Sequence, residues 1–77
     1  MEMEIRIFAV EVKSPVYDIR VDVDDPDEAV RVYNHLRDTQ QFASGALTCI
    51  LTGEVFCHFE MVKEGNGVRC DEWRATE

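Results

Sequence analysis

The stretch that begins at Asp25 has the clearest helical alternation of polar and apolar positions in the chain. At 100° per residue, Ala29, Tyr33 and Leu36 fall on one face of a helix, and polar side chains fall on the other. Asp25 suits the N-cap because its carboxylate can accept from free backbone N–H groups, and Pro26 suits the first helical position. The pattern predicts one amphipathic helix with a single face to bury.

Two strands are predicted before this helix. In residues 3–12 the apolar positions change from odd to even near Phe8-Ala9, which indicates either a strand buried on both faces or a bulge. Residues 16–23 alternate regularly, and the short connection at residues 13–15 predicts an antiparallel hairpin. The residues expected to face the core are Tyr17, Ile19, Val21 and Val23.

Three more strands are predicted after the helix. Residues 46–51 and 54–63 are mainly apolar and are separated by Thr52-Gly53, a two-residue turn that would place Leu47 opposite His58 and Cys49 opposite Phe56. Asn66-Gly67 tolerates the positive φ angles of a type I′ turn, and residues 68–73 would form the last strand.

This order predicts a single domain of α+β class over residues 1–77, with a small antiparallel sheet and one helix packed on one face. The third and fourth strands carry apolar residues on both faces, and one helix cannot cover both. The uncovered apolar surface indicates a second subunit, which would make the chain a homodimer.

Composition narrows the range of partners. Sixteen acidic residues against eight basic ones give a net charge of −8, which disfavours direct binding to nucleic acid or to an anionic membrane. A basic protein surface is the partner that this charge favours, and solubility alone is the simpler explanation. Three cysteines, an odd number, do not form a disulfide framework, and no targeting or membrane segment is recognised, so a cytoplasmic location is expected.

Candidate chemistry is sparse, and we expect no enzyme, metal or cofactor. Cys57 and His58 are adjacent in a strand and point to opposite faces, so this His cannot activate this Cys. Cys49 would share the face of His58 and not that of Cys57, and the spacing to Cys70 matches no zinc motif. The cysteines are therefore interpreted as structural, with Cys49 and Cys57 buried.

The densest charge lies at the start of the helix, where five acids occur within seven residues. A calcium loop is disfavoured because Pro26 occupies a position where a ligand is required. Helix capping and strand-end solvation explain much of the cluster, and the functional alternative is an acidic contact patch. The residues predicted to bind a partner are Asp22, Asp24, Asp25, Asp27 and Glu28, with Glu2, Glu4, Glu11 and Asp18 as a second group.

Trp73 has two interpretations. One is a buried side chain that completes the core. The other is an exposed aromatic anchor, since Trp and Arg are favoured hot-spot residues at interfaces. The small number of large apolar residues favours the core.

In size, charge and element order the chain is similar to small phage-encoded inhibitors, among them anti-CRISPR proteins and DNA mimics. The resemblance implies a non-enzymatic acidic protein that occupies a basic, nucleic-acid-binding surface of a partner protein. The alternative hypothesis is a self-associating structural or regulatory subunit that uses apolar sheet surface. A small enzyme is disfavoured because no nucleophile–base pair is found.

Overall fold

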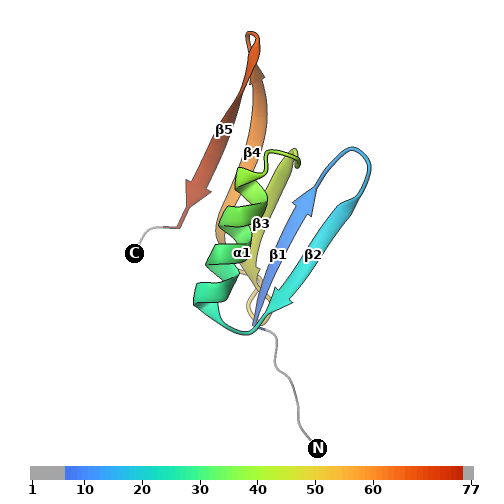
Figure 1. The fold of residues 1–77 in the computed structure, drawn as a ribbon. Helices are drawn as coiled ribbons and strands as arrows, with labels where there is room; N and C mark the ends of the chain where they lie inside the picture. Colours follow the sequence, from blue (N-terminus) through green and yellow to red (C-terminus); the bar gives the residue numbers. More distant parts are fainter. Residues whose placement is uncertain (1–6, 76–77) are drawn as a thin grey trace, which may run out of the picture.

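The chain forms one antiparallel sheet with a helix against one of its faces (Figure 1). The structure, a computed structural model, describes residues 7–75. The strand order is β2-β1-β3-β4-β5, and every neighbouring pair is antiparallel. This arrangement confirms the predicted α+β class. In chain order the elements are β1 (Phe8–Lys13), β2 (Asp18–Val23), α1 (Pro26–Asp38), β3 (Ser44–Cys49), β4 (Val55–Glu64) and β5 (Gly67–Arg74).

Helix α1 begins where its capping residues predict. The carboxylate of Asp25 accepts a hydrogen bond from the Glu28 backbone N–H at 3.1 Å, and Pro26 occupies the first turn. The helix ends at Asp38 with Thr39 as its C-cap, and Gln40 follows with a φ of 58° in the left-handed region. Within the part of the chain that the structure describes, no helix is long and apolar enough to span a membrane.

Strand β1 is an interior strand with both of its faces buried near its start. Its pairing with β2 and β3 runs without a shift from Phe8 to Lys13, which leaves no bulge at Phe8-Ala9. Val10 is fully buried on the helix side, and Ala9 is only 2% exposed on the other side. The two-sided interpretation of this strand is therefore confirmed within the described residues, and residues 3–6 of the predicted strand lie outside them.

A bulge in β4 changes the predicted register of the second half of the sheet. Leu47 lies opposite Cys57 and Thr48 lies opposite Val55, so Phe56 has no partner residue in β3. The extra residue bends the strand and lets Phe56 pack against the core, where its ring centroid is 5.8 Å from that of Phe8. The expected pairs of Leu47 with His58 and of Cys49 with Phe56 were wrong.

The shifted register redistributes the apolar residues expected on the second face. Ile50 and Leu51 belong to the turn before β4 and not to a strand. Cys49 and Cys57 both face the helix, and His58 faces the opposite side. The apolar surface left on that side by β3 and β4 is much smaller than the sequence indicates.

The hairpin between β4 and β5 is also offset by one residue from its prediction. Glu64 pairs with Gly67, so the turn is Gly65-Asn66 and not Asn66-Gly67. Gly65 has a φ of 60°, and Asn66 is not among the described residues with a positive φ. A glycine in the first turn position with this geometry is the pattern of a type II′ turn, which suits a hairpin as well as the expected type I′ turn.

The core lies between α1 and the helix-facing side of the sheet. Ala29 and Tyr33 of the helix are fully buried, and the ring of Tyr33 meets the edge of the Phe59 ring at a centroid distance of 5.8 Å. Burying a side chain of the size of Phe59 stabilises the fold by about 1.5–3 kcal/mol. The core cluster comprises Val10, Val12, Val23, Ala29, Tyr33, Phe42, Leu47, Cys57 and Phe59.

Strand β5 lies beyond the cover of the helix. All eight of its residues are exposed, and the far end of the β4–β5 hairpin extends past the other strands (Figure 1). We call the sheet surface opposite α1 the bare face.

We predict that Gly45→Ala lowers the free energy of unfolding by about 1–3 kcal/mol, because overpacking forces side chains out of their preferred rotamers. A Cβ at Gly45 would contact the Phe59 ring and lie 2.7 Å from Cγ1 of Val12. Gly67→Ala is the matched control, since its Cβ would meet nothing closer than the Glu64 carbonyl at 3.9 Å. Urea denaturation measures both, and equal effects of the two substitutions would contradict the packing argument.

Candidate functional site

The acidic cluster at the start of the helix is brought together as the sequence indicates. Asp24, Asp25, Asp27 and Glu28 are all exposed at the β2–α1 connection and in the first helical turn. The side chain of Asp25 is used for capping. Asp27 and Glu28 lie in the first turn, where their negative charge complements the positive end of the helix dipole. A structural role alone therefore explains their position.

The described members of the second predicted group, Glu11 and Asp18, lie on the bare face and are interrupted by basic side chains. Glu11 is opposite Arg20, and Asp18 is opposite Lys13. Nε of Arg20 is 2.8 Å from Oδ1 of Asp22. The hairpin β1–β2 therefore presents alternating charges in place of one acidic surface. Glu2 and Glu4 lie outside the described residues.

A trough of about 530 Å³ crosses the bare face between β1 and β5. It is hollow because β3 contributes short side chains at Ser44 and Ala46, and the strands on both sides contribute longer ones. The side chains that line it from the flanking strands are Glu11 and Lys13 of β1, His58 and Glu60 of β4, and Asp71 and Trp73 of β5.

Trp73 belongs to this trough, and its expected place in the core was wrong. Its side chain is 48% exposed, and its ring stacks on His58, the residue directly opposite in β4, at a centroid distance of 5.3 Å. The physical reason is strand parity. Glu72 points toward the helix, so its neighbour Trp73 must point to the bare face.

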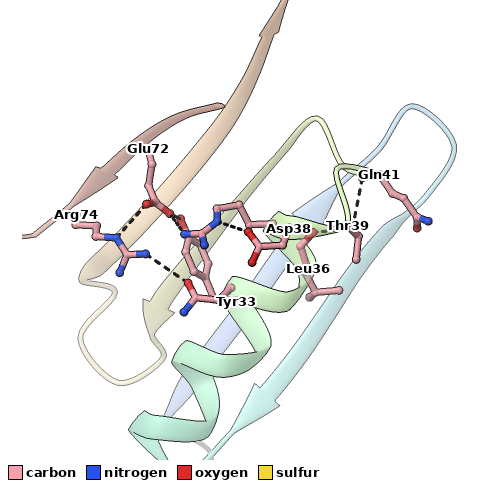
Figure 2. Close-up of polar contacts among 9 residues, drawn as sticks. Tyr33, Leu36, Asp38, Thr39, Gln41, Glu72 and Arg74 are labelled. Carbon is pink, nitrogen blue, oxygen red and sulfur yellow. Dashed lines mark hydrogen bonds and ion pairs between the residues drawn. The ribbon is translucent and has the colours of Figure 1, made fainter. Parts of the chain in front are cut away.

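Glu72 joins the edge strand to the helix through a set of charged hydrogen bonds (Figure 2). Its Oε2 accepts from the hydroxyl of Tyr33 at 2.8 Å and from Nη1 of Arg37 at 2.6 Å. Its Oε1 accepts from Nε of Arg74 at 3.0 Å, and Nη2 of Arg74 donates to Oδ1 of Asn34 at 3.4 Å. These bonds fix the strand parity that places Trp73 in the trough.

The hydrogen bonds around Glu72 and its partial burial shift the pKa values of Glu72 and Tyr33. Partial burial opposes ionisation of Glu72, but hydrogen bonds from Arg37, Tyr33 and Arg74 outweigh it and hold the pKa of this carboxyl below its ordinary value. Burial, followed by the hydrogen bond to Glu72, raises the pKa of Tyr33. Both effects keep Glu72 charged and Tyr33 neutral near pH 7. The set is therefore a structural latch and not an acid–base pair.

Two of the three cysteines are buried, as the sequence predicts. Cys49 and Cys57 are buried, Cys70 is exposed, and all three are free thiols. Burial raises the pKa of Cys57, which keeps its thiol protonated. Hydrogen bonds from Thr52 lower the pKa of Cys49. Within residues 7–75, no three His, Cys, Asp or Glu side chains converge as a metal site.

The trough is the functional candidate that sequence reasoning missed. The alternation in the last strand contained a signal for it, since Arg69, Asp71 and Trp73 share one face. The predicted Asn66-Gly67 turn concealed the partner of Trp73, because that register would pair Trp73 with Glu60, whereas the observed Gly65-Asn66 turn pairs it with His58. Comparison of the chain with protein-family models, curated proteins and solved structures found no significant match.

We predict that Glu72→Gln lowers the free energy of unfolding at pH 7 by about 1–3 kcal/mol, because it weakens charged hydrogen bonds to Tyr33 and Arg37. The folded pKa of Glu72 is depressed, so its stabilisation is present above its ordinary pKa and is lost as the pH falls through the folded pKa. The difference between the two proteins should therefore shrink in acid. Denaturant unfolding at several pH values measures it.

Glu54→Gln, in the exposed turn before β4, is the control and should change stability by less than about 0.5 kcal/mol. A difference between Glu72→Gln and the unchanged chain that stays constant down to about pH 3 would contradict the role of the charged carboxylate.

Proposed function

We propose that the chain is a non-enzymatic acidic binding protein that occupies a basic, nucleic-acid-binding surface of a partner protein. The observation that carries this proposal is the distribution of ion pairs. Arg20, Arg37, Arg69 and Arg74 each pair with an acidic residue of the same chain. The positive charge of these arginines is thus used internally, and the excess negative charge faces solvent elsewhere.

The uncompensated charge is concentrated at the start of α1. Asp24, Asp27 and Glu28 are exposed, and none of them takes part in an ion pair among the described residues. Closely spaced carboxylates on a rigid turn can imitate the phosphates of a nucleic acid and steer association with a basic surface. A protein of this kind acts as an inhibitor, in the manner of anti-CRISPR proteins and DNA mimics.

The proposal includes a cytoplasmic location. Two free thiols are buried, and the exposed Cys70 is unpaired, a condition that a reducing compartment maintains.

We predict that the immobilised protein captures a nucleic-acid-binding protein from lysate of its source cells, and that added duplex DNA or RNA releases it. The triple variant Asp24→Asn, Asp27→Asn, Glu28→Gln should bind that partner at least about tenfold more weakly, because it removes three charges that face the basic surface. Asp25 is left in place so that the helix cap is retained. Surface plasmon resonance at two salt concentrations measures the affinity.

The matched control removes three carboxylates elsewhere, at Asp38, Glu54 and Glu64, so that the net charge of the two variants is equal. An equal loss of affinity in both variants would show that only total charge matters. Retention of a partner that nucleic acid does not displace would contradict the proposal itself.

A second candidate function is self-association through the open edge of β5, which would make the chain a structural or regulatory subunit. Edge strands present unpaired backbone groups that can pair with another chain. Two antiparallel copies of β5 centred on Cys70 would place Arg69 of one opposite Asp71 of the other, so the strand is complementary to itself in charge.

If this pairing occurs, the molar mass measured by sedimentation equilibrium in the presence of reductant should rise with concentration. Arg69→Asp should then abolish the rise, because like charges would face each other across the pair, and the swapped variant Arg69→Asp with Asp71→Arg should restore it. A monomer mass at every concentration would exclude the second candidate.

A further inference from the structure

We infer that the trough on the bare face binds an arginine side chain of a partner protein, stacked on the His58–Trp73 aromatic pair and held by Glu60 and Asp71. This inference rests on the proposed function and deepens it, since it names a chemical group of the partner and a second place, apart from the acidic cluster at the start of α1, where that group binds. It depends on three features of the trough, which are its shape, its aromatic wall and its carboxylates.

The trough is a shallow, open hollow with room for one side chain. Ser44 and Ala46 form a low floor, and the trough of about 530 Å³ is bounded by β1 on one side and by β4 and β5 on the other. A volume in this range is typical of sites that admit a small group. The floor belongs to an interior strand, so the site is built on the rigid centre of the sheet.

The aromatic wall offers a surface for a flat cation. The rings of His58 and Trp73 are nearly parallel, with 21° between their planes, and nearly half of the Trp73 side chain remains exposed. A guanidinium is planar and weakly hydrated, and it stacks on aromatic rings more readily than an ammonium group does. An exposed tryptophan beside charged groups is also the residue type that contributes most at interfaces.

The carboxylates lie in the row next to the aromatic pair. Glu60 and Asp71 are directly opposite each other on β4 and β5, one step along the same face from His58 and Trp73. Like charges in this position destabilise a sheet. Arg69 reaches Asp71 at 3.3 Å, but Glu60 is exposed and takes part in no ion pair among the described residues. A cation that bridges the two carboxylates would relieve their repulsion.

The opposite wall determines where the cation binds. Lys13 of β1 lines the trough beside Glu11, and Ser44 separates it from Glu60. Its ammonium group offsets the carboxylate of Glu11, so the β1 side attracts a cation less than the β4–β5 side does. An incoming guanidinium is therefore directed to the β4–β5 wall, where its five N–H donors can reach both carboxylates and its flat face can reach the aromatic rings.

The test uses Trp73 as its own reporter, because it is the single tryptophan of the chain. Nona-arginine and nona-lysine peptides of equal charge are titrated into the purified protein, and both the emission of Trp73 and the anisotropy of a labelled peptide are recorded. We expect nona-arginine to change the emission and to bind about tenfold more tightly than nona-lysine.

The double variant Glu60→Gln, Asp71→Asn should weaken nona-arginine binding about tenfold. The matched control is Asp38→Asn, Glu54→Gln, which removes the same number of charges outside both the trough and the acidic cluster at the start of α1 and should retain most of the affinity. Circular dichroism checks that both variants are folded. Equal weakening in the two variants, equal binding of the two peptides, or an unchanged Trp73 emission would each overturn the inference.

The two proposals fail in different ways. If the Glu60→Gln, Asp71→Asn variant still captures the nucleic-acid-binding partner with full affinity, the trough does not bind an arginine of that partner, and the proposed function stands. If nona-arginine binds at the trough but no nucleic-acid-binding partner is captured, the trough stands and the proposed function fails.

Discussion

Tyr33 is the side chain on which the rest of the structure depends. It is fully buried between the helix and the sheet, where its ring packs against Phe59. Its hydroxyl donates to Glu72 in the edge strand, so one residue connects the apolar core with the polar latch (Figure 2). A buried hydroxyl without a partner would cost about 1–3 kcal/mol, which makes the position of Glu72 a requirement of the helix packing. Strand parity then places Trp73 on the bare face.

A second constraint is that one helix of thirteen residues covers only one face of the five-stranded sheet and leaves β5 uncovered. The chain adapts to it with short or polar side chains on the bare face, including Ser44, Ala46 and Thr48. The β4 bulge moves Phe56 toward the core. These features leave a hollow surface with charge at its rim and an aromatic pair in one wall, which is better suited to recognition of a cationic side chain than to burial against a broad apolar partner.

The sequence predicts the elements of this fold better than their register. The N-cap at Asp25, the interior position of β1 and the two-strand, helix, three-strand order follow from local chemistry and apolar periodicity, and all are confirmed within residues 7–75. The bulge at Phe56 could not be predicted, because it depends on how Phe8 and Phe56 fill the core together. Trp73 was assigned to the core because a count of large apolar residues ignores the requirement that Glu72 reach Tyr33. The clustering of acids at the start of α1 was readable from the chain, whereas the trough depends on residues from four strands.

We propose that basic groups bind to this protein at a defined site, the trough, and not merely through its net charge. Titration of the isotopically labelled protein with nona-arginine, followed by ¹H–¹⁵N NMR, tests it most directly. The account predicts that the largest shifts occur at the indole N–H of Trp73 and at the backbone amides of Ala46, His58 and Glu60. No shift at these groups, or shifts spread evenly over all exposed acidic residues, would contradict recognition at the trough.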